Sequence, residues 1–318
     1  MKYYIGIDLG GTNIVAAVVN EEGKIISKTN CKTNLPRIPE LVADDMARIS
    51  EEAVLKAGLT MEQIENVGIG SPGIINPSTG EIEYSCNFNY YNVPMSEMMN
   101  KRLKKPIYID NDANTAAIGE FAVGAGKGIH SMIAITLGTG IGGGIILNDK
   151  IYSGFNYAGG ELGHTVIQMD GRSCNCGRKG CFEAYASATG LIKTTIEYME
   201  KNPDSQMWQI AQGSKENVNG RTSFDAMRLG DKAAKDVVDT FIRHLAAGLT
   251  NVINIFQPEL VCIGGGISKE GDTLIKPLRL LIDQEDYARS IERRTQIVAA
   301  KLGNDAGIIG AAMLSQHQ

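Results

Sequence analysis

The chain has 318 residues, of which 43% are hydrophobic, and its formal net charge is −5. A chain of this length can form two domains that each bury a hydrophobic core. The acidic balance argues against a nucleic-acid-binding surface, no apolar run is long enough to span a bilayer, and the first residues show no signal-peptide pattern. We therefore expect a cytoplasmic protein whose partners include neither nucleic acid nor membrane.

The first part of the chain alternates apolar, β-branched runs with segments of helical periodicity. A Gly-Thr turn separates the first two strands, and a Ser-Pro-Gly turn follows the fourth. A cap residue, Asn111 or Asp112, begins the last helix. We predict strands at residues 3–8, 14–19, 25–33, 67–70 and 107–109, and helices at residues 39–57, 95–103 and 113–123.

The second part begins with a further strand–turn–strand pattern at residues 131–149. A polar stretch at 197–230 looks irregular before it becomes helical, and a long amphipathic helix then runs to Pro258. Strands alternating with helices indicate an α/β protein. The remaining predictions are helices at 231–256, 273–282 and 306–315, and strands at 260–263 and 297–300.

Two segments of the chain resemble each other. The run SMIAITLGTGIGGGIILND repeats the plan of YYIGIDLGGTNIVAAVVNE near the start of each half: strand, Leu-Gly, Gly/Thr-rich turn, strand. The repeat predicts two domains built alike, with a boundary near residues 114–119. Two such hairpins facing each other could bind a phosphate chain through backbone N–H groups.

The first hairpin offers several groups suited to a phosphate. Asp8 ends the strand and suits a Mg²⁺ ion that it would hold through a water molecule; the turn consists of Gly10, Gly11, Thr12 and Asn13. The motif is no Walker loop, because Gly-Lys-Ser/Thr is missing, and no dinucleotide fingerprint, because a strand follows. A plain hairpin is the alternative, and the second copy, Gly138, Thr139 and Gly140, favours phosphate binding.

Two further motifs each allow two interpretations. Asn111-Asp112 follows a strand, where ligands of α/β proteins gather, so Asp112 could take the proton of an attacking alcohol; the alternative is a helix cap. The triplet Gly264, Gly265 and Gly266 could let an adenine ring lie against the backbone. A tight strand-to-helix turn explains that triplet equally well.

A cluster of metal-ligand residues lies in the middle of the chain. Cys174, Cys176 and Cys181, with His164 upstream, supply a complete tetrahedral set for a structural Zn²⁺. Buried or redox-active thiols are the alternatives, but four ligands of the right type with glycines between them favour zinc. Two carboxylates flank this set, Glu161 and Glu183. We expect the other cysteines to be buried thiols: Cys31, Cys86 and Cys262.

Taken together, these motifs resemble the ROK family of sugar kinases and repressors, and within it the bacterial glucokinases. The matching stretches cover almost the whole chain in the family's order. They are IGIDLGGTN (5–13), GIGSPG (68–73), DNDANTAAIGE (110–120), TLGTGIGGG (136–144), GGELGH (159–164), CNCGRKGCFEAYAS (174–187) and CIGGGIS (262–268).

The resemblance implies an α/β fold of two actin/hexokinase-like (ribonuclease H-like) domains with a cleft between them. The expected domains are residues 1–115, completed by a C-terminal helix at about 303–318, and residues 116–302, which carry the zinc loop. The implied activity is ATP-dependent phosphorylation of a hexose at its 6-hydroxyl, above all glucose, as in glycolysis. It further implies structural Zn²⁺, Mg²⁺ with ATP, and a homodimer or homotetramer.

The resemblance also implies roles for individual residues. Asp112 would be the catalytic base, and His164 would bind zinc with one ring nitrogen and face the sugar with the other. ATP would lie between the two hairpins, with adenine near Gly264–Gly266. The residues implied in sugar binding are Gly73, Asn87, Asn111, Asp112, Glu161, His164 and Glu183.

One stretch departs from the family pattern. Glucokinases of the family tend to carry Pro-Asn-Leu and then Trp, where this chain has Cys86-Asn87-Phe88-Asn89-Tyr90. Another sugar therefore stays open, such as N-acetylmannosamine, N-acetylglucosamine or fructose. The rivals of another class are a sugar-responsive repressor, which would need a winged helix before the first hairpin, and a sugar-binding protein without catalysis.

Overall fold

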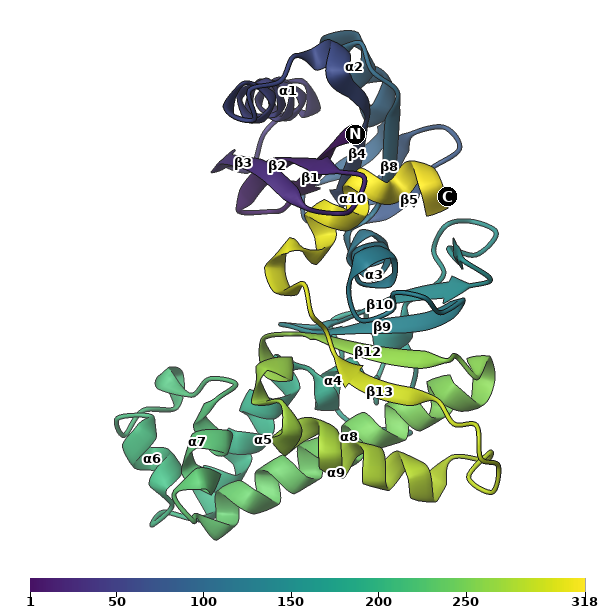
Figure 1. The fold of residues 1–318 in the computed structure, drawn as a ribbon. Coiled ribbons are helices and arrows are strands. Elements are labelled where there is room, and N and C mark those ends of the chain that lie inside the picture. Colours follow the sequence, from purple (N-terminus) through teal and green to yellow (C-terminus); the bar gives the residue numbers. More distant parts are fainter. Residues whose placement is uncertain (318) are drawn as a thin grey trace. The chain divides into compact units, whose positions relative to one another are not determined.

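The computed structural model describes residues 1–317, and its first sheet has five strands. In spatial order these are β3 (Ile25–Lys32), β2 (Asn13–Asn20), β1 (Tyr3–Leu9), β4 (Ile64–Ser71) and β8 (Ile107–Asn111) (Figure 1). β1, β4 and β8 run parallel, whereas β2 pairs antiparallel with β1 and β3 pairs antiparallel with β2. Buried positions are nearly continuous along β1 and β4, as expected for strands covered on both faces.

Helices cover both faces of this sheet. α1 (Pro39–Lys56) packs against β2 and β3, and α2 (Met95–Leu103) packs against α1 and β8. On the other side, α10 (Ala306–His317) packs against β1, β4 and α3 (Asp112–Val123) (Figure 1). α10 is buried along most of its length and apolar on all sides, the composition typical of a helix enclosed by other elements.

A small antiparallel sheet follows β4 and was not predicted from the sequence. It consists of β5 (Ile74–Asn76), β6 (Glu81–Ser85) and β7 (Tyr90–Val93). The strands are short and mix polar with apolar residues, so no period of two stands out in the sequence. The turn between β6 and β7 holds Cys86, which is exposed, so the expectation of a buried thiol there was wrong.

The second sheet repeats the five-strand plan. Its order is β11 (Lys150–Ile151), β10 (Ile141–Leu147), β9 (Ser131–Leu137), β12 (Leu260–Gly265) and β13 (Gln296–Ala299). α8 (Lys232–Phe256) begins after Asp231, whose carboxylate accepts from the Ala234 amide at 2.9 Å as an N-cap. α9 (Asp272–Glu285) packs against α8 and β13 (Figure 1).

The stretch from 197 to 230 is more ordered than its polar composition predicts. Three helices occupy or overlap it: α5 (Ala188–Lys201), α6 (Gln206–Ile210) and α7 (Thr222–Arg228). Ser187 and Ser205 cap the first two, and tertiary packing on α8 and between α6 and α7 stabilises helices too short to form alone. The remaining elements are α4 (Glu183–Ala186) and short 3₁₀ helices at Met61–Gln63, Leu162–His164, Lys215–Asn217, Gly266–Glu270 and Gly303–Asp305.

The chain divides into two compact units. The first comprises Met1–Ala134, Gly144–Gly160 and the residues from Ala300 on, and the second comprises Ile135–Gly143 and Glu161–Ala299. This division falls within β9 and β10, and it leaves α3 with α10 in the first unit. Among the helices in residues 1–317, none is long and apolar enough to cross a membrane.

We predict that the contact between α10 and α3 tolerates no added methyl group. A Cβ at Gly310 would lie 1.7 Å from the Thr115 carbonyl oxygen, whereas one at Gly307 in the same helix would meet its nearest atom at 3.9 Å. Gly310→Ala should therefore lower the free energy of unfolding by about 1–3 kcal/mol or more. Gly307→Ala should be neutral or slightly stabilising, because alanine favours a helix. Urea titration of both variants tests this, and equal stabilities would contradict it.

Candidate functional site

Strand pairing aligns the carboxyl ends of three strands in the first unit. Asp8 at the end of β1 pairs with Gly70 of β4, and Gly70 pairs with Asp110 of β8. Because these strands run parallel, all three residues lie at the same edge of the sheet. Ligands of open α/β sheets bind at this edge.

The buried carboxylate of Asp110 fixes the start of α3. Its Oδ1 accepts hydrogen bonds from the backbone amide of Asn111 and from the side chain of Asn114, both at 2.7 Å. Asn111 is the N-cap, since its Oδ1 accepts from the Ala113 amide at 2.8 Å; its Nδ2 donates to the Gly73 carbonyl at 3.0 Å. Asp110 was not among the site residues predicted from the sequence, although its place directly before Asn111 and Asp112 indicated such a role.

Two carboxylates of this edge influence each other. Burial, and then the negative charge of Asp112, raise the pKa of Asp8, while Lys28 acts in the opposite direction. Nearby protein atoms also raise the pKa of Asp112 by desolvation, but its side chain is exposed to solvent, and hydrogen bonds from the backbone of Ala113 and of Asp112 itself lower the pKa in part. Two acids that lose hydration and repel each other form a place where a cation or a proton is favoured.

The first Gly-Thr hairpin is closed by its own backbone and by the residue after β3. The Gly10 amide donates to the Asn13 carbonyl at 3.0 Å. The Thr33 hydroxyl donates to the Gly10 carbonyl at 2.6 Å, and the Thr33 amide donates to the Thr12 carbonyl at 3.0 Å. Gly11, Thr12 and Asn13 remain exposed, so their backbone is open to a ligand.

The second hairpin, in the second unit, has a similar closure. The Gly138 amide donates to the Gly140 carbonyl at 3.0 Å. Residues at the start of α5 bond the turn from outside: the Ala188 amide donates to the Gly138 carbonyl at 2.9 Å and the Thr189 hydroxyl to the Thr139 carbonyl at 2.7 Å. The Gly264–Gly266 triplet ends β12, and Gly265 lies against the backbone of Leu137, directly before this hairpin.

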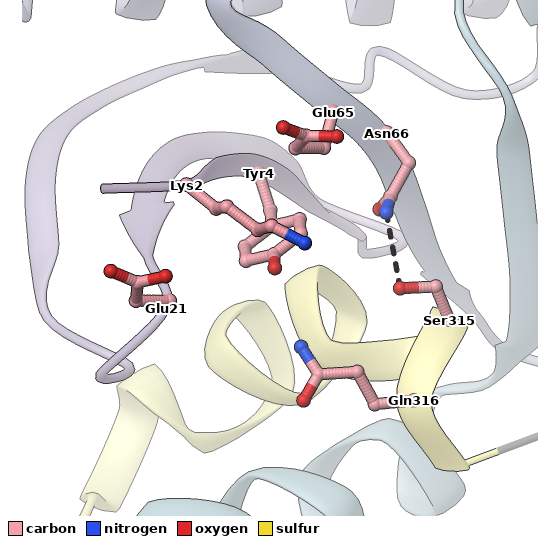
Figure 2. Close-up of a pocket in the computed structure, with 7 residues that line it drawn as sticks. All are labelled: Lys2, Tyr4, Glu21, Glu65, Asn66, Ser315 and Gln316. Atoms are coloured by element: carbon pink, nitrogen blue, oxygen red, sulfur yellow. Dashed lines mark hydrogen bonds between the residues drawn. The ribbon is translucent and has the colours of Figure 1, made fainter.

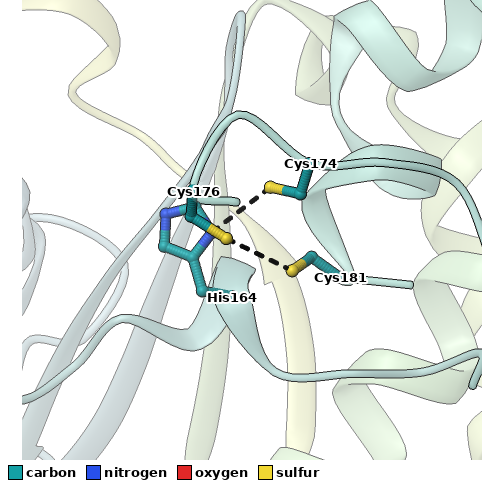
Figure 3. A group of neighbouring side chains, drawn as sticks. All are labelled: His164, Cys174, Cys176 and Cys181. Atoms are coloured by element: carbon teal, nitrogen blue, oxygen red, sulfur yellow. Dashed lines mark hydrogen bonds between the residues drawn. The ribbon is translucent and has the colours of Figure 1, made fainter. Parts of the chain in front are cut away.

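The four predicted metal ligands form a cluster in the second unit. One ligand atom from each of His164, Cys174, Cys176 and Cys181 lies within 4.8 Å of the others (Figure 3). Cys174 Sγ lies 3.7 Å from His164 Nδ1, and Cys176 Sγ lies 3.6 Å from Cys181 Sγ. Three sulfur atoms and one imidazole nitrogen so placed are compatible with a tetrahedral Zn²⁺. Burial and the neighbouring thiols raise the pKa of the Cys181 thiol to about 12.

Both flanking carboxylates lie next to this cluster. His164 Nε2, the ring nitrogen not facing the thiols, lies 3.9 Å from Glu161 Oε2. Glu183 Oε1 lies 3.8 Å from Cys174 Sγ, and Glu183 Oε2 accepts from the Ile141 amide at 2.8 Å. The structure thus brings the predicted sugar residues together in two groups, one in each unit: Gly73, Asn111 and Asp112, and Glu161, His164 and Glu183. Asn87 lies in the exposed turn after β6.

A polar pocket of about 440 Å³ lies in the first unit at the opposite ends of the strands (Figure 2). Lys2 and Tyr4 line it near the start of β1, Glu65 and Asn66 near the start of β4, and Glu21, Ser315 and Gln316 complete it. Asn66 donates to Ser315 at 3.0 Å, while its Oδ1 is buried without a hydrogen-bond partner. None of the residues predicted for sugar or nucleotide lines this pocket.

Comparison with known proteins identifies the family. The model of the ROK family matches residues 4–318, so the chain belongs to this family. A glucokinase of Thermotoga maritima is 40% identical over 316 residues, which cover 99% of this chain and 97% of the relative.

Two solved structures of the family share the fold. A Streptomyces griseus glucokinase in complex with glucose and AMPPNP is 34% identical, covers 98% of both chains and has a TM-score of 0.81. A Thermus thermophilus ROK hexokinase is 30% identical, covers 98% of this chain and 97% of the other, and also has a TM-score of 0.81. The chain therefore has the two-domain actin/hexokinase-like fold, and the predictions of family and fold class are confirmed.

The raised pKa of Asp112 predicts a small pH-dependent cost in stability, because solvent around this exposed side chain screens the effect. A carboxyl whose pKa is higher in the folded than in the unfolded protein destabilises the fold once pH exceeds both values. Asp112→Asn removes the charge and keeps the shape, so it should raise the melting temperature near pH 7. The gain should shrink as the pH falls from about 7 through the raised pKa of the wild-type carboxyl, because protonation removes the buried charge. Thermal melts across this range test the sign, and a gain independent of pH would contradict it.

Proposed function

We propose that this chain transfers the γ-phosphoryl group of ATP to the 6-hydroxyl of glucose. The observation that carries the proposal is full-length similarity to bacterial glucokinases, one of which was solved with glucose and AMPPNP. The chemistry available in the chain agrees with it: a carboxylate at the start of a helix, and two Gly-Thr hairpins. Phosphoryl transfer needs little else, because it depends on positioning and on charge stabilisation.

Asp112 would be the general base that takes the proton of the sugar's 6-hydroxyl. Its position is fixed by Asp110 and Asn111, which hold the first turn of α3. A raised pKa makes the carboxylate a stronger base. Asn111 would bind a sugar hydroxyl beside it, together with the Gly73 backbone and Asn87.

Glu161, His164 and Glu183 would bind the other sugar hydroxyls. His164 has its Nδ1 beside Cys174, and its Nε2 on the side of Glu161, so one ring can serve both metal and sugar. Carboxylates accept from neutral hydroxyls, and each such hydrogen bond to a charged group contributes about 1.5–3 kcal/mol. Several carboxylates that accept hydrogen bonds from hydroxyls suit a neutral, polyhydroxylated substrate.

The two hairpins would bind the phosphates of ATP, at Gly10–Asn13 and Gly138–Gly140, with adenine near Gly264–Gly266. Asp8 would hold Mg²⁺ through its water shell, since a divalent cation relieves the repulsion between Asp8 and Asp112. When bound, Mg²⁺ neutralises phosphate charge that develops during transfer. A cytoplasmic location, where ATP is available, belongs to the same proposal.

The Cys₃His cluster would hold a structural Zn²⁺ that keeps the loop carrying Glu161 and Glu183 in place. Its ligand set leaves no open position for a reacting water. We also propose the functional domains to be residues 1–115 with 303–318, and residues 116–302. Excluding water from the bound substrates would remove a competing acceptor.

The test of function is ADP release measured on glucose, fructose, mannose, N-acetylglucosamine and N-acetylmannosamine. We expect the highest kcat/KM with glucose. Asp112→Asn should lower kcat about 10²–10⁴-fold, because an amide cannot take the proton, while calorimetry should show nearly unchanged glucose binding. Near-normal kcat in this variant would contradict the general-base role and show that Asp112 only stabilises the start of α3. A preference for an N-acetylated sugar would contradict glucose as the substrate.

The zinc proposal predicts about one Zn²⁺ per chain by elemental analysis. Cys176→Ser should lower both metal content and stability, because metal binding contributes to the folding free energy. Cys86→Ser is a matched control, since Cys86 is equally exposed but lies outside the cluster. A fully active, zinc-free preparation, or equal metal loss in both variants, would contradict the assignment.

A further inference from the structure

The second hairpin is clamped by one short stretch of chain, residues 183–189. Three hydrogen bonds from this stretch meet three successive parts of the turn. The Ala188 amide bonds the Gly138 carbonyl at 2.9 Å, the Thr189 hydroxyl bonds the Thr139 carbonyl at 2.7 Å, and Glu183 Oε2 accepts from the Ile141 amide at 2.8 Å. All of these residues belong to the second unit.

The hydrogen bonds of this clamp also fix the direction of the neighbouring amides, because the peptide bond is planar. In a trans peptide, the carbonyl of one residue and the N–H of the next point in opposite directions within one plane. Because α5 holds the carbonyls of Gly138 and Thr139, the amides of Thr139 and Gly140 must point away from α5. Successive amides that point the same way form an anion-binding concavity.

The first hairpin is held by the same pair of donor types. The Thr33 hydroxyl bonds the Gly10 carbonyl and the Thr33 amide bonds the Thr12 carbonyl. These bonds orient the amides of Gly11 and Asn13 by the same rule. A threonine hydroxyl and a backbone amide thus hold the turn carbonyls of both hairpins, although Thr33 follows a strand and Thr189 lies in a helix.

Gly140 shows how closely the clamp fits. A Cβ at this position would lie 2.2 Å from Glu183 Oε2, so any side chain here would displace the carboxylate from the Ile141 amide. Glu183 has a second oxygen, Oε1, which is not bonded to the hairpin. One carboxylate can therefore hold the hairpin with Oε2 and meet a sugar hydroxyl with Oε1.

We propose that Thr189 and Glu183 are positioning residues for the nucleotide, because they orient the hairpin amides that would bind the phosphates of ATP. The inference rests on the proposed function for the identity of the ligand. It assigns to Glu183 a role on the nucleotide side in addition to the sugar side. Thr189 has no place in the sugar site, so it isolates the nucleotide role.

The experiment compares Thr189→Val, which removes the hydroxyl but keeps the shape, with Thr189→Ser, which keeps the hydroxyl. Calorimetric titration with Mg-AMPPNP should show a Kd about three- to tenfold higher for Thr189→Val, the range that one hydrogen bond contributes. Thr189→Ser should restore most of the affinity. Steady-state kinetics should show a matching rise of KM for ATP, with KM for glucose unchanged.

Thr195→Val is the matched control. Thr195 lies in the same helix and its hydroxyl donates to the Leu191 carbonyl at 2.8 Å, within α5 and away from the hairpin. It should bind Mg-AMPPNP like the wild type. The inference is overturned if Thr189→Val binds the nucleotide normally, if Thr195→Val loses as much affinity, or if the wild type binds no Mg-AMPPNP. A wild type that binds Mg-AMPPNP but phosphorylates no hexose overturns the proposed function alone.

Discussion

The parallel register of β1, β4 and β8 determines where the first unit can perform chemistry. It aligns Asp8, Gly70 and Asp110 across three strands, so that residues after β8 begin α3 beside the end of β1. A shift of one residue would turn every side chain of a strand to the other face. The buried apolar residues of β1 and β4 make such a shift unfavourable, and the hydrophobic core therefore also positions Asp112.

This arrangement has a cost in stability. Burial and the charge of Asp112 raise the pKa of Asp8, and desolvation raises that of Asp112, while Lys28 and backbone hydrogen bonds offset these shifts only in part. The surrounding structure compensates with close backbone packing, as where α10 meets α3 at Gly310. Active sites commonly combine unfavourable local electrostatics with a rigid support. Here the supporting helix α10 comes from the C-terminal end of the chain.

The sequence predicted features that are local along the chain. α8 was found because its apolar stripe is long and its ends are marked by Asp231 and Pro258, and the Cys₃His cluster because its ligands are close in sequence. The sheet of β5, β6 and β7 was missed because its strands are short and lack a clear period. Glu183 was expected only at the sugar, because its bond to Ile141 joins residues far apart in the chain, and no spacing rule reveals such a pair.

The internal repeat shows the same limit of sequence-based prediction, because the sequence of a turn does not reveal which distant residues hold it. The repeated sequence specifies a strand, a Gly-Thr turn and a strand, but the groups that hold each turn lie outside the repeat, at Thr33 in one case and at residues 183–189 in the other. Threonine suits the task because its β-branched side chain has few rotamers. The second clamp follows directly after Cys181, so the three clustered cysteines, the carboxylate of Glu183 and the hairpin clamp lie in one continuous segment, residues 174–189. A substitution in this segment can therefore affect the cluster and the clamp together.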